Sequence, residues 1–209
     1  MSQYKDYSYT DHKATHAHQY LTGPLLDILK TEKPGNILDL GCGNGALVNK
    51  LLSLGFEAYG TDASEMGIEI ARKTHPNRFT LQNLDHEGLP QEFAHLSFDT
   101  IISTEVIEHL YDPGAFIDFC VNILRKNSNG GQLILSTPYH GYLKNLCLAV
   151  AGKWDSHANP LWDGGHIKLW SRATLTQLLE EKGFEITNFK GCGRLPYLWK
   201  SMIISARLK

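Results

Sequence analysis

The sequence has few cysteines and no long apolar run. Its four cysteines, Cys42, Cys120, Cys147 and Cys192, form no C-x-x-C pair, so neither a disulfide framework nor a zinc knuckle is indicated. No stretch approaches the roughly 20 apolar residues that a membrane-spanning helix needs. The start, Met1–Asp6, lacks the apolar centre of a signal peptide. These absences predict a cytoplasmic protein with reduced thiols.

The sequence also lacks an excess of positive charge. Lysine and arginine number 20 and aspartate and glutamate 22, which gives a net charge of −2. Proteins that bind long RNA or DNA usually carry a basic surface, so nucleic acid is a disfavoured partner. No linker rich in Pro, Gly or Ser divides the 209 residues, and a chain of this length buries one sizeable core. We therefore expect one domain over residues 1–209.

Apolar runs alternate with helical patterns along most of the chain. Such alternation is typical of an α/β protein with a doubly wound, mostly parallel sheet. The last two predicted strands have no helix between them and should form an antiparallel hairpin. We expect strands at 36–40, 58–61, 79–82, 100–103, 132–136, 184–189 and 201–206, and helices at 21–29, 46–54, 65–73, 113–124 and 172–182, the first interrupted at Gly23-Pro24.

The segment Ile37–Gly45 places a carboxylate just before a glycine-rich turn at the end of an apolar strand. Gly41, Gly43 and Ala46 also satisfy the spacing of a dinucleotide site, with Asp62 where an acid that binds ribose belongs. In such a site, however, the turn faces a pyrophosphate, which the carboxylate of Asp39 would repel. Asp39 therefore favours a cofactor that carries positive charge.

With Asp39 and Asp62 together, the sequence resembles the class I S-adenosylmethionine-dependent methyltransferases from about residue 35 to the C-terminus. The resemblance implies a Rossmann-like seven-stranded sheet with an antiparallel last strand, and a cofactor with an ammonium and a sulfonium group near Asp39. Asp62 has two oxygens for the ribose hydroxyls, although it could equally be an N-cap of the next helix. The expected cofactor-binding residues are Asp39, Gly41, Gly43, Asp62, Ala63, Asn83, Leu84 and Thr104.

A cluster of acids and a histidine, Glu105, Glu108 and His109, follows the fourth predicted strand. In one helical turn, their i, i+3 and i+4 spacing would place them on one face. Two carboxylates and an imidazole suit a divalent cation, and the ligand types alone do not choose among metals. The alternative is that the segment only shapes the floor of a pocket that contains no metal.

A further resemblance favours the metal. Residues 135–139 and 163–171 look like the corresponding segments of ubiquinone-biosynthesis O-methyltransferases and of small-RNA 2′-O-methyltransferases. The resemblance to the RNA enzymes implies a site for Mg²⁺, Mn²⁺ or Zn²⁺ made by Glu105, Glu108, His109 and His166. Such an ion lowers the pKa of a bound hydroxyl and so favours an oxygen acceptor. Without metal, His109 or His166 would be the catalytic base.

Two segments are expected to cover the site. Residues 1–30, with tyrosines and histidines that include Tyr4, Tyr7 and Tyr9, could form a lid over the cofactor, or be an ordinary mobile terminus. Residues 138–171 form an insertion with a short apolar helix near 142–154, which would either cover an apolar substrate or make weak contact with a membrane surface. We favour the substrate cover.

These observations together predict an enzyme that methylates a hydroxyl of a small, aromatic, catechol-like or phenol-like acceptor. One alternative is an N-methyltransferase that acts on a small amine and needs no metal. Another is a non-catalytic protein that binds S-adenosylmethionine and activates a partner. The sequence does not assign the acceptor, the metal or the oligomeric state.

Overall fold

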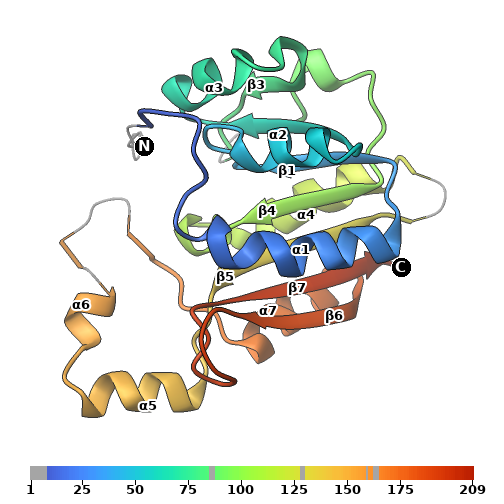
Figure 1. Cartoon of the computed structure of the whole chain (residues 1–209). Coiled ribbons are helices and arrows are strands. Elements are labelled where there is room, and N and C mark those ends of the chain that lie inside the picture. Colours follow the sequence, from blue (N-terminus) through green and yellow to red (C-terminus); the bar gives the residue numbers. More distant parts are fainter. Residues whose placement is uncertain (1–8, 85–87, 128–129, 159, 162–164) are drawn as a thin grey trace.

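The computed structural model describes residues 9–84, 88–127, 130–158, 160–161 and 165–209. The chain folds around one sheet (Figure 1). The strands are β1 (Asn36–Leu40), β2 (Glu57–Asp62), β3 (Phe79–Leu81), β4 (Thr100–Thr104), β5 (Gln132–Pro138), β6 (Phe184–Cys192) and β7 (Ser201–Leu208). The α-helices are α1 (His18–Glu32), α2 (Ala46–Ser53), α3 (Glu65–Arg72), α4 (Pro113–Leu124), α5 (Tyr142–Val150), α6 (Trp154–Ala158) and α7 (Arg172–Glu181). Short 3₁₀ turns are η1 (Pro76–Arg78), η2 (Gln91–Phe93) and η3 (Ile107–His109).

The seven strands lie in the order β3-β2-β1-β4-β5-β7-β6. The pairs from β3 through β5 are parallel, and β7 is antiparallel to both β5 and β6. The predicted doubly wound sheet with an antiparallel last strand is therefore confirmed. The reversal between β1 and β4 also creates the switch point where ligands bind in open α/β sheets.

Helices cover both faces of the sheet. Successive side chains of a strand point to opposite faces, so each strand contributes to both cores. Leu38 and Leu40 of β1 pack with α4 and α7 in one core cluster, whereas Ile37 packs with α1, α2 and α3 in the other. The same alternation separates Ile101 from Ile102 on β4. This explains why the central strands read as continuous apolar runs rather than as alternating ones.

Helix α1 is continuous through Pro24, so the predicted interruption at Gly23-Pro24 is wrong. Proline removes one backbone hydrogen bond, but the side chains of Leu21, Leu25 and Leu29 are buried against the sheet. Tertiary packing of an apolar face contributes more to helix stability than local propensity does. The helix therefore persists across an unfavourable residue.

The insertion after β5 contains two helices, α5 and α6, rather than the single helix expected near residues 142–154. A positive φ of 62° at Gly152 breaks the helical path between them. Both helices stand apart from the sheet and its covering helices, beyond the carboxyl end of β5 (Figure 1). Among the described residues, no helix is long and apolar enough to cross a membrane.

Helix α4 begins where the sequence places its capping residue. The Asp112 carboxylate accepts a hydrogen bond from the backbone N–H of Ala115 at 2.9 Å, and Pro113 occupies the first turn. We expect Asp112→Ala to lower the free energy of unfolding by about 1 kcal/mol, because an orphan N–H loses its partner. Urea denaturation would measure this loss. The control is Glu69→Ala at an exposed position of α3, which should change stability by less than about 0.5 kcal/mol. Equal losses of stability in Asp112→Ala and Glu69→Ala would contradict the capping role.

Candidate functional site

The glycine-rich turn after β1 is built by backbone conformations that favour glycine. Gly41 and Gly43 have φ values of 82° and 54°, a region that other residues rarely adopt. The backbone N–H groups of Gly41 and Cys42 donate to the Thr61 carbonyl at 2.8 and 2.9 Å, which fixes the turn against β2. A side chain at Gly43 would also meet the ring of Tyr9. The N-terminal segment thus lies on the turn.

Asp62, at the end of β2, connects this turn to the start of α3. One carboxylate oxygen accepts a hydrogen bond from the Gly43 N–H at 2.7 Å, and the other from the Ser64 N–H at 2.8 Å. The N-cap of α3 is Ser64, whose hydroxyl accepts from the Gly67 N–H at 2.9 Å. The alternative reading of Asp62 as the N-cap is therefore wrong, because the helix begins two residues later than that reading requires.

Asp39 lies beside Asp62 and is 1% exposed. One of its oxygens, Oδ1, has no hydrogen-bond partner among the described residues. Burial, and then the negative charge of Asp62, raise the pKa of Asp39 to about 8. A buried carboxylate next to a second carboxylate is stabilised when it binds a proton or a cation. This edge of the sheet therefore suits a ligand with a positive group.

The remaining predicted cofactor residues lie at the ends of neighbouring strands. Ala63 follows β2, Asn83 and Leu84 follow β3, and Thr104 ends β4 with its hydroxyl 3.4 Å from the Nε2 of His18. Gln82 was not named from the sequence. Its side chain is 7% exposed, and its Oε1 has no partner among the described residues. A polar residue at the end of a strand is the signal that identifies it.

The predicted N-terminal lid is seen from Tyr9 onward, while Tyr4 and Tyr7 lie outside the described residues. Its backbone is held to the glycine-rich turn by Asn44, whose side-chain amide donates to the carbonyls of Asp11 and Lys13, both at 2.8 Å. Farther along, the Nε2 of His16 lies 2.9 Å from the Nζ of Lys200. The segment therefore spans from the cofactor edge to the end of the sheet that carries β7.

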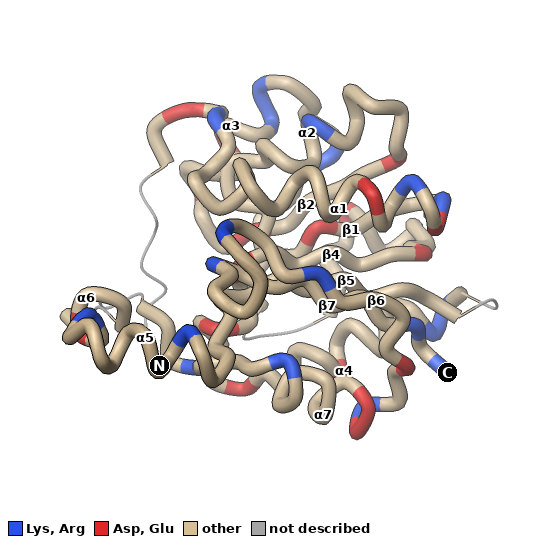
Figure 2. Tube along the Cα trace, turned by 60° about the horizontal axis from the view of Figure 1, so that its bottom comes forward, with Lys and Arg blue, Asp and Glu red and all other residues tan. Residues whose placement is uncertain are grey.

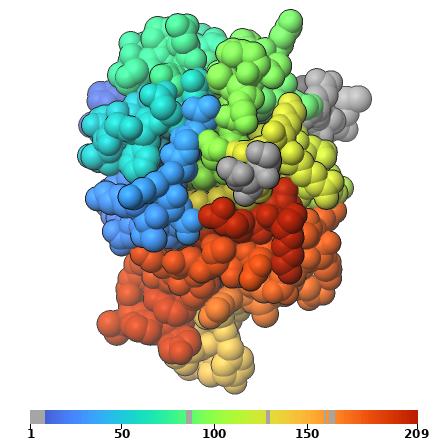
Figure 3. Space-filling view, turned by 90° about the vertical axis from the view of Figure 1, so that its right-hand side faces the viewer, coloured from blue at the N-terminus to red at the C-terminus, as the bar shows by residue number. Residues whose placement is uncertain are grey.

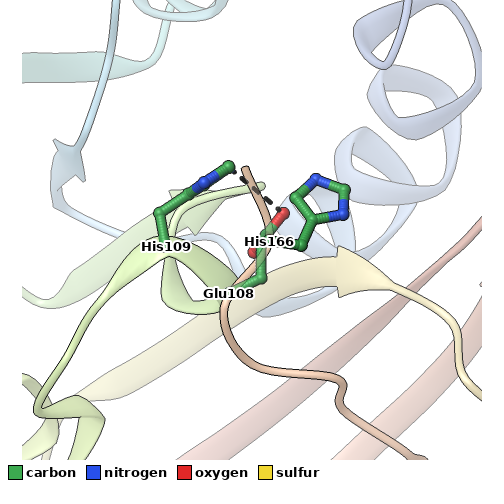
Figure 4. Close-up of side chains that lie close together, drawn as sticks. All are labelled: Glu108, His109 and His166. Atoms are coloured by element: carbon green, nitrogen blue, oxygen red, sulfur yellow. Dashed lines mark ion pairs between the residues drawn. The ribbon is translucent and has the colours of Figure 1, made fainter. Parts of the chain in front are cut away.

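On the other side of β4, Glu108, His109 and His166 converge (Figure 4). One potential ligand atom from each lies within 4.8 Å of the others. Glu108 Oε1 and His109 Nε2 are 4.0 Å apart, and the two imidazole centroids are 5.0 Å apart. Two of these residues come from η3, and His166 comes from the segment between α6 and α7. Residues 57 positions apart in the chain, 109 and 166, thus share one site.

Backbone hydrogen bonds bring the two segments together. The carbonyl of Glu108 accepts from the N–H groups of Ile167 and Lys168, both at 3.0 Å. The Nδ1 of His109 lies 3.2 Å from the carbonyl oxygen of Gly165, which makes that ring nitrogen the donor. Residues 162–164, which precede this segment, lie outside the described residues. In the described part, it is η3 that positions His166.

The electrostatics of this cluster suit a bound cation. Glu108 is 1% exposed, and neither carboxylate oxygen has a hydrogen-bond partner among the described residues. Burial, and then the charge of Glu105, raise the pKa of Glu108 well above its usual value. Burial, with smaller effects from nearby cations and imidazoles, lowers the pKa of His166 to about 4. His166 is therefore neutral near pH 7, the form in which imidazole binds metals.

Glu105 does not join this cluster. Its two carboxylate oxygens accept hydrogen bonds from the hydroxyls of Ser136 and Ser201, at 2.8 and 3.0 Å. The backbone of Glu105 has a φ of 56°, and the 3₁₀ turn starts only at Ile107. The single helical face that the spacing suggested is therefore interrupted. The structure brings three of the four predicted ligands together and places Glu105 beside them.

Two further histidines line this region. His140, just after β5, is 7% exposed, and neither ring nitrogen has a hydrogen-bond partner among the described residues. Its ring centroid lies 5.3 Å from that of His157 in α6. Burial, and then the positive charge of Lys144, lower the pKa of His140 to about 4. The position of His140 at a strand end could have identified it from the sequence, whereas nothing in the pattern of α6 singles out His157.

Residues 12–188 match the family model described as "Methyltransferase domain". The chain belongs to the class I S-adenosylmethionine-dependent methyltransferase family. It is 32% identical over 163 residues to a ubiquinone biosynthesis O-methyltransferase of Dinoroseobacter shibae, which covers 74% of this chain. The chain spans only 62% of that relative's length.

Solved methyltransferase structures support the fold. The structure superposes with a TM-score of 0.69 on magnesium protoporphyrin IX methyltransferase from Synechocystis PCC 6803, which was solved with bound S-adenosylhomocysteine (22% identity; 96% of this chain and 91% of that one). A protein from Pyrococcus horikoshii OT3 gives a TM-score of 0.70 at 19% identity, over 97% and 95% of the two chains. At these identities the similarity shows a shared fold and no more.

Asp39 should make the stability of the ligand-free protein depend on pH. Because its folded pKa of about 8 lies above the unfolded value, the folded state retains a proton that the unfolded chain has released. Stability should therefore fall as pH rises from about 4 to about 8. We expect Asp39→Asn to be more stable than the parent at pH 8 and similar to it at pH 4, as measured by urea denaturation.

The matched control is Asp155→Asn in exposed α6, which should follow the parent at both pH values. If the parent and Asp39→Asn kept a constant difference in stability from pH 4 to pH 8, the buried carboxylate would not be the titrating group.

Proposed function

We propose that this protein transfers the methyl group of S-adenosylmethionine to a hydroxyl of a small aromatic acceptor, assisted by a divalent cation at Glu108, His109 and His166. The observation that carries this proposal is the buried Glu108 carboxylate, which has no hydrogen-bond partner among the described residues and lies against two imidazoles. Ionising a buried carboxyl group that accepts no hydrogen bond is costly, as its raised pKa indicates, and a cation would compensate the charge. The resemblance to named O-methyltransferases agrees with an oxygen acceptor.

The cofactor is assigned to the edge formed by β1, β2 and β3. Asp39 would face the ammonium group of the methionine part, and Asp62 the ribose hydroxyls. Gly41 and Gly43 allow the ligand to approach the backbone. The adenine would lie near Gln82, Asn83 and Leu84, with Ala63 and Thr104 on its borders. This arrangement leaves the methyl group directed toward the segment after β4, where η3 begins.

The donor set fits a divalent metal. One carboxylate and two imidazoles, one of them neutral because of burial, are ligands that Zn²⁺, Mn²⁺ and related ions accept, and Mg²⁺ would favour more oxygen ligands. When bound, such an ion lowers the pKa of a coordinated hydroxyl. Glu105 is assigned a supporting role because Ser136 and Ser201 already hold its oxygens.

The chemistry required of the chain is mainly alignment. The acceptor oxygen attacks the methyl carbon, the carbon–sulfur bond breaks, and S-adenosylhomocysteine leaves. The sulfonium already makes the methyl group electrophilic, so the rate depends on an in-line approach and on removal of the hydroxyl proton. In the absence of an ion, His109 or His166 would accept that proton; as metal ligands they would leave it to pass to water. His140 and His157 provide neutral imidazoles that can hydrogen-bond a second polar group of the acceptor.

A small acceptor fits the surface better than a nucleic acid does. Lysines and arginines are interspersed with acidic residues along the described chain (Figure 2). An enzyme that acts on long RNA would be expected to show a continuous basic track. The α5–α6 insertion carries His157, whose ring lies 5.3 Å from that of His140. The insertion would therefore cover the acceptor.

We expect separate residues to serve the cofactor and the acceptor. Asp62→Ala should weaken binding of S-adenosylhomocysteine by about tenfold or more, because both the ribose contact and the Gly43 hydrogen bond are lost. Glu108→Gln should leave that binding within about twofold of the parent. Isothermal titration calorimetry would measure both affinities. Equal losses in the two variants would show that the division between the sites is wrong.

Metal removal should abolish methyl transfer to catechols. With the protein treated with chelator, we expect turnover of a catechol to fall by about 100-fold and to return with Mg²⁺, Mn²⁺ or Zn²⁺. His166→Ala should show no such rescue, because it removes a ligand. The measurement is the rate of S-adenosylhomocysteine formation. Turnover of catechols that is unaffected by chelation would refute the metal, and turnover of amines alone would favour the N-methyltransferase alternative.

A further inference from the structure

A groove of about 530 Å³ lies between α5 and the loop that joins β6 to β7. In Figure 1 that loop reaches down beside one end of α5, and Figure 3 shows the helix projecting below the C-terminal strands. The volume is within the range of pockets that hold one small molecule. None of the residues that line the groove takes part in the proposed methyl transfer.

The walls of the groove are mainly apolar. Leu148 of α5 faces Leu195 and Leu198 of the loop across it. Leu195 is 70% exposed, which is unusual for a leucine in a segment fixed by neighbouring contacts. Covering exposed leucines with an alkyl chain would be favourable by roughly 25 cal/mol for each Å² removed from water. The groove therefore suits an aliphatic group.

The charged lining residues are all cations: Lys144, Lys153 and Arg194. Lys144 is 6% exposed, and its ammonium donates to the carbonyl of Lys200 at 3.2 Å. Burial, and then the positive charge of Arg194, lower the pKa of Lys144 to about 8, while Glu105 acts in the opposite direction. Neither Lys153 nor Arg194 forms an ion pair with a described residue. An anion between these cations would relieve their repulsion.

The loop that carries Arg194 is held in an unusual conformation. Arg194 and Tyr197 have φ values of 68° and 64°, which are unfavourable for residues with a side chain. The Lys200 N–H, at the end of the loop, donates to the carbonyl of Cys192 at 2.9 Å, and the Trp199 ring packs against the ring of Tyr139 at 5.1 Å. The loop is thus anchored at its base, with Arg194 and Leu195 beside the groove.

We propose that this groove binds one anionic, single-chain amphiphile, with its charged group between Lys144 and Arg194 and its chain along Leu148, Leu195 and Leu198. A bilayer fits less well, because Lys144 is only 6% exposed whereas Leu195 is 70% exposed, and the headgroups of an intact membrane do not reach a buried ammonium. The proposal rests on the groove alone and not on the proposed methyl transfer.

Titration with decanoate, below its micelle concentration, tests the site in the full-length protein. Decanoate should bind. 1-Decanol, which has the same chain without the charge, should bind at least about tenfold more weakly. Arg194→Gln should weaken decanoate by about tenfold and leave decanol unchanged, because only the charge contact is lost. Arg125→Gln, an exposed arginine at the end of α4, is the matched control and should behave as the parent does.

Cys147 provides a second measurement that locates the ligand. It lines the groove and is exposed, whereas the other three cysteines are buried. Bound decanoate should slow alkylation of Cys147 by a maleimide at least about fivefold in the parent and less in Arg194→Gln. Decanoate that bound without protecting Cys147, or equally tightly to the parent and to Arg194→Gln, would overturn the proposal.

Two further outcomes are distinguishable. Sedimentation with phosphatidylglycerol vesicles, together with absent decanoate binding, would make the surface a membrane contact and refute the groove. Binding of S-adenosylhomocysteine is measured on the same samples. Absence of S-adenosylhomocysteine binding would count against the proposed function. A protein that bound S-adenosylhomocysteine but not decanoate would count against the groove alone.

Discussion

Four carboxylates lie at the edge where the parallel strands end. They differ in how many hydrogen bonds their oxygens accept, and this difference distinguishes the parts of the site. Asp62 accepts two backbone hydrogen bonds, from Gly43 and Ser64. Glu105 accepts two from serine hydroxyls. Asp39 has one oxygen without a partner among the described residues, and Glu108 has two. Because a buried negative charge without a partner is costly, the last two carboxylates mark where a cationic ligand would stabilise the protein.

The two uncompensated carboxylates lie on either side of the switch between β1 and β4, which gives the site two parts. Asp39 belongs to the strand that leads into the glycine-rich turn. Glu108 belongs to η3, and its carbonyl also fixes the segment that carries His166. In the proposed reaction, the methyl group would pass from the first part to the second across the end of β4. The sheet would then supply the alignment that the proposed methyl transfer requires.

The proposed acceptor side depends on chain segments outside the common sheet. The α5–α6 insertion supplies His157, and the β6–β7 loop supplies Arg194. Lys144 lies where the insertion, the loop and Glu105 approach one another, since its pKa responds to both Arg194 and Glu105. A ligand in the groove would therefore lie next to the acceptor site without sharing the histidine cluster. Such segments can vary while the sheet and the cofactor edge stay the same.

Local patterns in the sequence predicted the sheet and most helix boundaries, because strand periodicity, capping residues and glycine turns act over a few neighbouring residues. β1 and α4 have the predicted bounds. Tertiary contacts account for the continuation of α1 through Pro24, the hydrogen bonds of Glu105 to Ser136 and Ser201, and the approach of His157 to His140. These depend on packing and hydrogen bonds between residues far apart in the chain, which local patterns do not encode.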